Sequence, residues 1–575
     1  MKFLLAAINA KYIHTNLAIR LLAAYTEQHT GICPTLCEFT INQQPEEILR
    51  ALYQQQPDVI GFSCYIWNIS IIKDLVCQLK LVLPNTRIFL GGPEISYDDG
   101  LLRQIPCELL VRGEGEQTVA NLLQAWEQGQ AVDQIPGISW WDGHTMHHNP
   151  SPAPLELDDI PFAYQHCQGL EHKIIYYETS RGCPYRCGYC LSSMEHGVRF
   201  LSQERVEQDL AFFLKQKVKQ VKFVDRSFHC DPARALSIWK FIAAHDNGAT
   251  NFHCELNAET LQLESLDFLQ TVRPGLFQFE IGVQSTNPQT MAAVRRTGDW
   301  GRLCQVVRTL QKGGNIHLHL DLIAGLPYED FDSFGRSFDQ VYALDPHQLQ
   351  LGFLKLLQGC ELHTRQQEFS LVCSQQPPYE VLCTRWLPFD RLLRLKTIAY
   401  LVEHYHNARR YQHSLNALMG YFDSAFACFD QFAAFWENRQ LAERSLSNQD
   451  TYAVLFAFAQ EAGCDPDELA WRMNYDFTLH QNPKRLPAFL KQKESVLSLE
   501  QIRIFFENEQ NLARYLPAYH GIPGKQVSRM AHLGWYPFDA NMNPKGSYLL
   551  FDYKHKDLFG NATVTELDPR LLQTP

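Results

Sequence analysis

Three cysteines lie close together in the segment 179–190, at Cys183, Cys187 and Cys190. Thiols at this spacing in a tight loop can converge on one small inorganic centre, and thiolates are the ligands that iron–sulfur clusters use. Three thiols are too few to close a tetrahedral zinc site, so zinc would need a fourth ligand such as His196. Free or purely structural thiols are the other alternative. The spacing therefore favours an iron–sulfur centre with one coordination position left for another ligand.

The elements around the cysteines are those that a barrel would use to position them. A strand is predicted over residues 173–178, immediately before the cysteine loop. Helical patterns separate the strands that are predicted after it, over residues 221–225, 252–256, 277–283, 316–323 and 347–353. About six such units suffice for an incomplete (β/α)6 barrel, whose active site lies at the carboxyl ends of the strands. We predict this partial barrel over residues 171–375, after a proline-rich linker over residues 151–170.

The cysteine spacing, with Tyr189 just before the third thiol, resembles the Cys-x3-Cys-x2-Cys signature of the radical S-adenosylmethionine (SAM) superfamily. In that superfamily the three thiolates hold a 4Fe–4S cluster, and the amino and carboxylate groups of SAM chelate the fourth iron. The resemblance implies that Cys183, Cys187 and Cys190 are the cluster ligands. It also implies that Tyr189 lies near the adenine of SAM.

Two predicted strand ends resemble the motifs through which superfamily members bind SAM, in residues 280–285 and 321–327. The resemblance implies that Glu280 accepts hydrogen bonds from both ribose hydroxyls and that Gly325 admits the adenine edge. It assigns to the same cofactor the neighbouring residues Gln284, Ser285 and Ala324.

The chain departs from the superfamily pattern after the second predicted strand. The Gly-Gly-Glu stretch often found there is replaced by Val224-Asp225-Arg226-Ser227. Asp225 is the candidate for binding the methionine amino group, because a carboxylate can accept hydrogen bonds from an ammonium. The alternative is an internal ion pair between Asp225 and Arg226.

Short apolar runs alternate with helical periods through residues 1–150. This alternation predicts a doubly wound parallel sheet with helices on both faces. Ligands of such sheets sit at the carboxyl ends of the strands, where the loops with Gly91, Gly92, Gly113 and Glu114 would converge. Glycines let a backbone approach a bulky ligand closely, although the same glycines also serve in structural turns.

A doubly wound domain ahead of such a barrel is similar to the cobalamin-binding-domain branch of the superfamily, over roughly residues 1–370. The resemblance implies cobalamin beside Gly91, Gly92, Gly113 and Glu114. Modules that supply a histidine to cobalt carry Asp-x-His-x-x-Gly after the first strand, whereas His14 stands here without that Asp or Gly. We therefore expect cobalamin without a histidine ligand. The alternative is a scaffold domain that only packs against the barrel.

Residues 376–575 follow a helical period over most of their length and are dense in aromatic side chains. At helical spacing, aromatic residues are more often core than substrate site. The segment resembles the C-terminal domain of unknown function that is attached to one branch of these enzymes. We predict an α/β protein with a mainly helical C-terminal domain.

Composition limits the partners of the 575-residue chain. Lys plus Arg number 51 against 63 for Asp plus Glu, and this net charge of −12 makes nucleic acid an unfavoured partner. No run reaches the about 18 apolar residues that span a bilayer, and no export signal is evident, so we expect a cytoplasmic protein without a membrane partner. The 17 cysteines are scattered, which fits metal chemistry better than a disulfide framework.

The resemblance implies an enzyme that cleaves SAM reductively at a 4Fe–4S cluster. With cobalamin bound, methylation of an unactivated carbon in a small-molecule or natural-product substrate is the expected reaction. A reductant such as flavodoxin or ferredoxin would supply the electron. One alternative is a cobalamin-assisted rearrangement or a tRNA-modifying radical enzyme, and another is a non-catalytic cobalamin or redox sensor. Catalytic side chains beyond the cofactor ligands are not identified.

Overall fold

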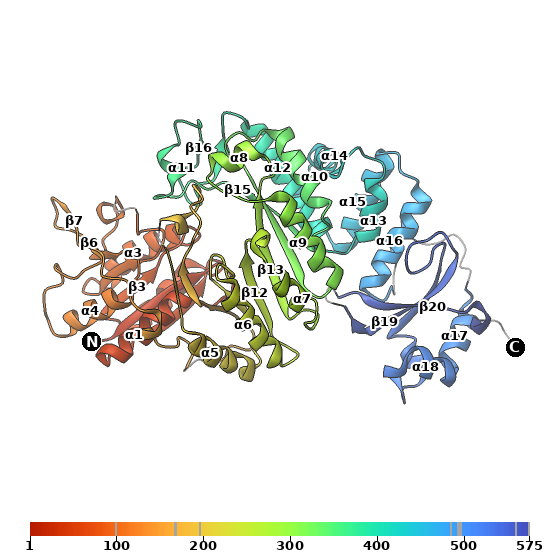
Figure 1. Ribbon diagram of the computed structural model, residues 1–575, viewed down its shortest axis with the longest axis horizontal. Coiled ribbons are helices and arrows are strands. Elements are labelled where there is room, and N and C mark those ends of the chain that lie inside the picture. The colour runs from red at the N-terminus through yellow and green to blue at the C-terminus, as the bar shows by residue number, and fades with distance from the viewer. Residues whose placement is uncertain are drawn as a thin grey trace. The chain divides into compact units, whose positions relative to one another are not determined.

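The computed structural model describes residues 1–97, 100–165, 169–194, 197–483, 486–490, 497–557 and 560–572. The chain divides into two compact units, Met1–Phe331 with Gly352–Phe389 and Asp332–Leu351 with Asp390–Pro575 (Figure 1). The domain boundaries expected at residues 150, 170 and 375 all fall inside the first unit and stay predictions. No helix in the described ranges is long and apolar enough to cross a bilayer.

The chain begins with a seven-stranded sheet in the order β2-β1-β3-β4-β5-β6-β7. The first five strands by chain order run parallel, and β6 and β7 form an antiparallel hairpin at its edge. The strands are β1 (Phe3–Asn9), β2 (Thr35–Thr40), β3 (Val59–Ser63), β4 (Arg87–Gly91), β5 (Leu109–Val111), β6 (Ile138–Trp141) and β7 (Met146–His148).

Helices cover both faces of this sheet because its central strands are apolar on both sides. In β1, Phe3, Leu5 and Ala7 pack in one core with α1 (Leu17–Thr30) and α4 (Glu116–Glu127). Leu4, Ala6 and Ile8 of the same strand pack in a second core with α2 (Pro45–Gln55) and α3 (Ile69–Val82). The predicted doubly wound arrangement is confirmed.

A six-stranded sheet follows, in the order β15-β14-β13-β12-β11-β8. Each pairing among β8, β11, β12, β13 and β14 is parallel. The strands are β8 (Ile174–Tyr177), β11 (Gln220–Phe223), β12 (Asn251–Leu256), β13 (Phe277–Gln284), β14 (His317–Ala324) and β15 (Gln348–Phe353), and the helices between them are α5 (Gln203–Gln216), α6 (Pro232–Ala244), α7 (Leu263–Leu269), α8 (Pro288–Ala293), α9 (Trp300–Gly313) and α10 (Phe331–Tyr342). This sheet has the six strands expected of the partial barrel.

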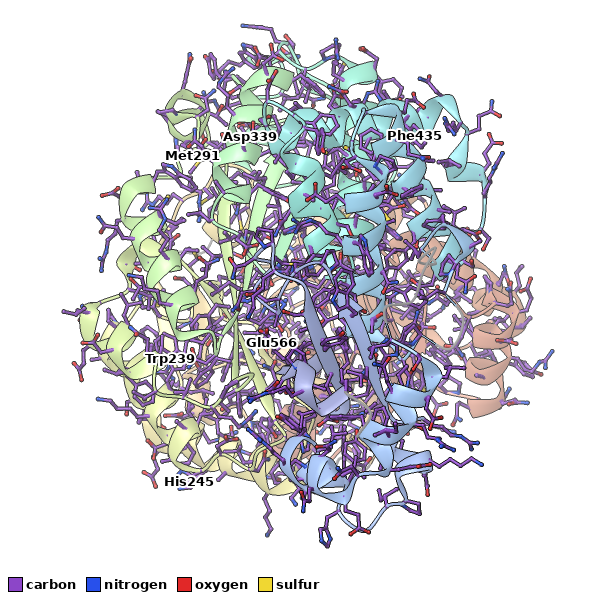
Figure 2. All side chains as sticks on the ribbon, turned by 90° about the vertical axis from the view of Figure 1, so that its right-hand side faces the viewer. Trp239, His245, Met291, Asp339, Phe435 and Glu566 are labelled. Atoms are coloured by element: carbon purple, nitrogen blue, oxygen red, sulfur yellow. The ribbon has the colours of Figure 1, made fainter. Side chains whose placement is uncertain are left out.

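The two faces of the barrel sheet differ in chemistry. Buried and half-buried residues alternate along β13, and the buried Phe277 and Phe279 contact the ring of Trp239 in α6, which Figure 2 labels. Residues of the opposite parity, such as Glu280, therefore point away from the helices. We call the side away from α6 the inner face of the barrel sheet.

After β15 come α11 (Glu361–Thr364) and a short hairpin of β16 (Val372–Cys373) and β17 (Val381–Cys383). The C-terminal segment is mainly helical, as predicted. Its helices are α12 (Phe389–Leu401), a π-helical turn (Val402–Asn407), α13 (Gln412–Met419), α14 (Ala425–Asn438), α15 (Asn448–Glu461), α16 (Pro466–His480), α17 (Leu499–Glu507), α18 (Glu509–Tyr515) and α19 (Gly524–Val527). The α14 aromatics Phe429, Phe432 and Phe435 are buried, which confirms that they form core.

The C-terminal segment also contains a sheet that helical periodicity did not indicate. β18 (Ala531–Tyr536), β19 (Ser547–Lys556) and β20 (Ala562–Leu567) pair antiparallel. One face of the sheet packs Leu533 and Leu550 against α17, and the other packs Phe551 against Tyr475 of α16. The central strand β19 is buried at three consecutive residues, Leu549 to Phe551, and therefore lacks the apolar–polar alternation that marks a half-exposed strand.

Candidate cofactor site

The cysteine loop begins at the carboxyl end of β8. β9 (Ser180–Gly182) pairs antiparallel with β10 (Val198–Phe200) and closes the base of the loop. Gly182 has a φ of 97°, and a Cβ there would lie 2.1 Å from the carbonyl oxygen of Gly197. Only glycine therefore fits where the two strands begin to diverge.

The loop brings its three thiols together. Cys187 is buried, Cys183 and Cys190 are half-buried, and the amide of Cys190 donates to the Cys187 carbonyl at 3.0 Å. Burial raises the pKa of the Cys183 thiol, and the nearby Cys190 and Cys187 raise it further. Such mutual effects act only at short range, so the donor set fits an iron–sulfur cluster. His196, the possible fourth ligand to zinc, lies outside the described residues.

A cation that sequence analysis missed lies beside the loop. Nη1 of Arg296 is 3.8 Å from Sγ of Cys187, and its Nη2 donates to the carbonyl of Gly282 at 2.5 Å and to Oδ1 of Asn257 at 3.0 Å. A guanidinium stabilises a neighbouring thiolate. Arg296 therefore connects the cysteine loop to the ends of β12 and β13. It stands 109 residues from Cys187 in the chain, so no local spacing indicates the contact.

Asp225 has its carboxylate directed at the start of the cysteine loop. It is 1% exposed and accepts from the amides of Thr179 and Ser180 at 2.7 and 2.8 Å and from the Thr179 hydroxyl at 2.6 Å. The arginine in this hydrogen-bonded group is Arg234 rather than Arg226. It donates to Oγ1 and to the carbonyl of Thr179. The three hydrogen bonds make Asp225 a positioning residue for the loop, whatever else it contacts.

The predicted SAM residues of β13 run from the middle of that strand, at Glu280, to just past its end, at Ser285. Glu280 on the inner face contacts Nζ of Lys222 at 3.0 Å and Nε2 of His253 at 2.9 Å. Gln284 adopts a left-handed φ of 70° at a bulge in the strand. Ser285 is buried and donates to Glu329 at 2.6 Å. Glu280 and Ser285 thus already have partners within the chain.

The remaining predicted SAM residues lie in the cysteine loop and at the end of β14. Tyr189 is half-buried, and burial raises the pKa of its hydroxyl. Ala324 ends β14 and is fully buried. Gly325 has a φ of 89°, and a Cβ there would lie 2.6 Å from Cγ1 of Val381 in β17. Any side chain at 325 would displace β17, so Gly325 is required for packing as well as for the expected approach of adenine.

The predicted cobalamin glycines lie at the carboxyl ends of β4 and β5. The carbonyl of Gly91 accepts from the amide of Cys64 at 2.7 Å, so the loops after β3 and β4 touch. Gly92 has a φ of 116°, and a Cβ there would lie 2.5 Å from the Cys64 carbonyl oxygen. Gly113 has a φ of 69°, and a Cβ there would find nothing within 4 Å. The space beside Gly113 is therefore open to a ligand.

Gly92 and Gly113 form a matched pair for mutation to alanine. Left-handed backbone alone costs a non-glycine residue about 1–2 kcal/mol, which both variants bear. Gly92→Ala adds a collision with the Cys64 backbone, for which overpacking suggests about 1–3 kcal/mol more. We expect Gly92→Ala to lower the urea midpoint of the N-terminal sheet clearly more than Gly113→Ala. Equal midpoints would show that the two loops are not held as the structure has them.

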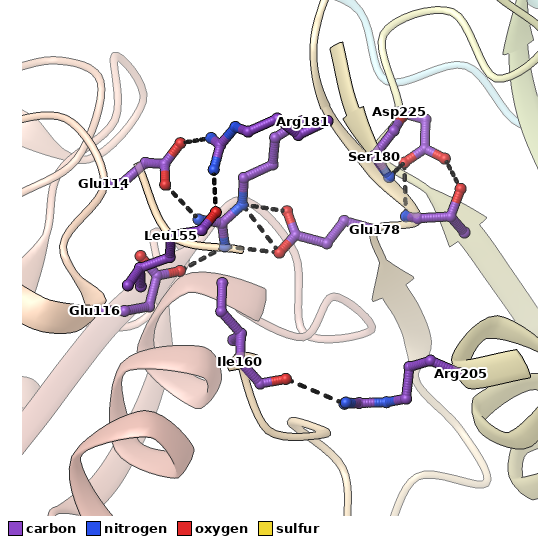
Figure 3. Close-up of polar contacts among 11 residues, drawn as sticks. Glu114, Glu116, Leu155, Ile160, Glu178, Ser180, Arg181, Arg205 and Asp225 are labelled. Carbon is purple, nitrogen blue, oxygen red and sulfur yellow. Dashed lines mark hydrogen bonds and ion pairs between the residues drawn. The ribbon is translucent and has the colours of Figure 1, made fainter. Parts of the chain in front are cut away.

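Glu114 takes part in an ion-pair network between the β5–α4 loop and the cysteine loop (Figure 3). Arg181 of β9 contacts Glu114 Oε2 at 3.2 Å, Glu116 Oε1 at 2.5 Å and Glu178 Oε1 at 2.7 Å. Arg199 of β10 also contacts Glu114. Glu114, which we expected beside cobalamin, therefore connects the β5–α4 loop to the cysteine loop.

The loop after β1 also reaches the barrel. Nδ1 of His14 lies 3.3 Å from the hydroxyl of Tyr176 in β8, and His14 forms a parallel bridge with Ile174.

The loop after β3 carries an aromatic pair that sequence analysis missed. The rings of Tyr65 and Trp67 stack at 4.3 Å, and Trp67 is 43% exposed. These rings offer an apolar surface at the same sheet edge as the glycines.

Three family models match successive parts of the chain. Residues 4–123 match the B12 binding domain, residues 177–341 match the radical SAM superfamily, and residues 367–551 match a protein family of unknown function, DUF4080. The resemblance inferred from the sequence is therefore confirmed. These families imply a 4Fe–4S cluster, SAM and cobalamin as the cofactors.

Among curated relatives, the chain is 25% identical over 381 residues to the cobalamin-dependent radical SAM methyltransferase TokK of Streptomyces tokunonensis, covering 62% of this chain and 55% of TokK. It is 26% identical over 301 residues to the 2-(S-pantetheinyl)-carbapenam-3-carboxylate methyltransferase of Streptantibioticus cattleyicolor, covering 48% and 44%. The chain thus spans about half the length of these relatives. The cobalamin-dependent radical enzyme OxsB, solved with aqua-cobalamin and SAM, has the same fold, with a TM-score of 0.58 at 14% identity over 83% of this chain and 79% of OxsB.

Proposed function

Because the chain carries a B12-binding domain, a radical SAM domain and a C-terminal DUF4080 domain, we propose that it is a cobalamin-dependent radical SAM methyltransferase. In this proposal it cleaves SAM reductively and methylates an unactivated carbon of a small-molecule or natural-product substrate. The observation that carries the proposal is the contact of the cysteine loop with the β5–α4 loop through Arg181. This contact joins the loop with the predicted cluster ligands to the loop with the predicted cobalamin contacts.

Cys183, Cys187 and Cys190 would hold the cluster, and Arg296 would stabilise the Cys187 thiolate. When bound, the cluster supplies the electron that cleaves the sulfonium, and cobalamin carries the methyl group. The further side chains that we propose for SAM are Tyr189, Asp225, Glu280, Gln284, Ser285, Ala324 and Gly325, and those for cobalamin are Gly91, Gly92, Gly113 and Glu114. Of these, Asp225 and Glu114 act by positioning, because their carboxylates are occupied by Thr179, Ser180, Arg181 and Arg199.

Two further proposals follow from the chemistry. A small one-electron donor such as flavodoxin or ferredoxin would reduce the cluster. A cytoplasmic location would keep the cluster and the 17 cysteines reduced.

The test uses the full chain, reconstituted anaerobically with iron, sulfide and cobalamin. With SAM and reduced flavodoxin, we expect 5′-deoxyadenosine by mass spectrometry, and S-adenosylhomocysteine only in samples that contain cobalamin. S-adenosylhomocysteine reports methyl transfer, whereas 5′-deoxyadenosine reports the radical step. A protein with a full cluster that releases neither product would be a sensor rather than an enzyme. 5′-deoxyadenosine with no dependence on cobalamin would indicate a radical enzyme without corrin chemistry.

A further inference from the structure

The inner face of the barrel sheet is polar where barrel interiors are usually filled by branched apolar side chains. Six ionisable residues of the strands β11, β12, β13 and β14 point to the inner face: Lys222, His253, Glu255, Glu280, His319 and Asp321. The residues of opposite parity, such as Phe279 and Leu320, are fully buried. The side chain of Glu255 is 30% exposed and that of Lys222 is 25% exposed. The inner face is therefore reached by solvent and is not a packed core.

Most of these groups are paired. Glu280 contacts both Lys222, at 3.0 Å, and His253, at 2.9 Å. His319 Nε2 lies 2.9 Å from Oδ1 of Asp321. Burial alone would raise the pKa of Glu280, yet the His253 hydrogen bond and the Lys222 charge hold it well below its usual range. Glu280 is therefore ionised and matched by Lys222.

Glu255 is the exception. Its ion-pair partner among the described residues is Lys222, whose Nζ is 4.0 Å away and closer to Glu280. Glu255 also stands in register with Glu280 on the neighbouring strand, so two carboxylates face each other across the ladder. Like charges in such positions repel. Burial first, and the Glu280 charge second, raise the pKa of Glu255 to about 7, against the opposing effects of Arg226 and Lys222.

Glu255 thus lacks a cation of its own among the described ion pairs, because Lys222 is shared with Glu280. Above pH 7 the carboxylates of Glu255, Glu280 and Asp321 face the Lys222 ammonium, the Arg226 guanidinium and the imidazole of His319. Burial alone would lower the pKa of His319, but the hydrogen bond and charge of Asp321 raise it above its usual value, so the positive charge of His319 is paired with Asp321. His253 is neutral, because burial lowers its pKa. A cation bound beside Glu255 would relieve the repulsion.

We propose that the inner face is the substrate pocket and that it binds a protonated amine of the substrate between Glu255 and Asp321. The inference rests on the proposed function, because only an enzyme needs a substrate pocket below the cysteine loop. It deepens that function by naming the substrate class: a hydrophilic small molecule that carries an ammonium group.

Other occupants fit the same residues less well. A metal ion could be held by Glu280, His319 and Asp321, whose donor atoms lie within 4.8 Å of one another. The Lys222 ammonium, however, already lies 3.0 Å from Glu280 and would repel it. An anion would meet three carboxylates, and an apolar molecule would strip water from ionised groups, which costs several kcal/mol per ion.

The test uses n-butylammonium as the probe, with butan-1-ol and butyrate as neutral and anionic counterparts. Saturation-transfer NMR is recorded on the full-chain holoenzyme with an unreduced cluster and saturating SAM, so that the SAM pocket is filled and no turnover occurs. We expect n-butylammonium to bind and the alcohol and butyrate not to compete. Affinity should increase as pH rises from 6 to 8, because Glu255 ionises through about pH 7 while an alkylammonium stays charged below about pH 10.

Glu255→Gln should weaken n-butylammonium binding at least about ten-fold and remove its pH dependence, and Asp321→Asn should weaken it as well. Glu264→Gln is the matched control, since Glu264 lies on α7 and pairs only with Lys240 at the surface among the described contacts. Binding that is equal for the alcohol, or unchanged in Glu255→Gln, would overturn the proposal. Butyrate binding in place of n-butylammonium would assign the pocket to an anionic substrate. SAM cleavage by the same preparation tests the proposed function separately.

Discussion

Replacing Cys183, Cys187 and Cys190 together by alanine should remove the cluster and abolish reductive cleavage of SAM. In the proposed site each thiolate would hold one iron, and the loop closed by β9 and β10 would supply all three ligands from one short segment. Wild-type chain reconstituted under anaerobic conditions should contain about four iron atoms and give an axial electron paramagnetic resonance signal on reduction. The triple variant should contain none and release no 5′-deoxyadenosine.

A second triple variant controls for the loss of three thiols. Cys33, Cys37 and Cys77 lie in or beside the N-terminal sheet, and two of them are exposed. Their replacement by alanine should leave iron content and SAM cleavage unchanged. A full complement of iron in the Cys183/Cys187/Cys190 variant would place the cluster on other cysteines of the chain.

Local patterns determined most of the elements correctly. α4 begins at Glu116 and β5 spans Leu109–Val111, as their apolar spacing predicts, and α2 begins at Pro45, where proline fits the first turn of a helix. The cysteine loop could be located because its ligands are neighbours in sequence. Signals of this kind are available whenever the residues that act together lie within one or two turns of each other.

Contacts between distant segments had no such signal. Glu114 looks like part of a glycine turn, yet its partner Arg199 stands 85 residues away. The contact of Asp225 with the methionine of SAM stays a prediction, and no local pattern indicates its hydrogen bonds to Thr179 and Ser180. The opposition of the Glu255 and Glu280 carboxylates depends on the register of β12 with β13, which no single-strand pattern specifies. Tertiary pairing, rather than residue type, decides what these charged groups do.

Arg181→Met should destabilise the first unit strongly, and more than Arg199→Met does. The Arg181 side chain is 13% exposed and is shared by Glu114, Glu116 and Glu178. Removing one partner of a buried ion pair typically costs about 3–5 kcal/mol, because the charges left behind lose their compensation. The variant should also lose iron and cobalamin during gel filtration, since the network joins the cysteine loop to the β5–α4 loop.

The stability lost by Arg181→Met should increase as the pH rises. Burial already raises the pKa of Glu178 above the usual value of a glutamate, and Arg181 opposes this rise. Without Arg181 the folded chain holds a proton on Glu178 that the unfolded chain has released, so stability should fall as pH increases from about 5 to 8. The urea midpoint of Arg181→Met should therefore approach that of wild type near pH 5 and diverge from it near pH 8.

Two comparisons separate buried-charge loss from simple loss of packing. Arg199→Met removes a half-exposed partner of Glu114 while Arg181 remains, so we expect a loss of stability below about 1 kcal/mol.

The triple variant Arg181→Met, Glu116→Gln, Glu178→Gln removes the cation together with two of the carboxylates that it pairs with. It should regain part of the stability lost by Arg181→Met and should lose the pH dependence, because replacing all partners of a buried pair is far less costly than removing one. If the triple variant were instead less stable than Arg181→Met at pH 8, the network would act through hydrogen-bond geometry and not through charge.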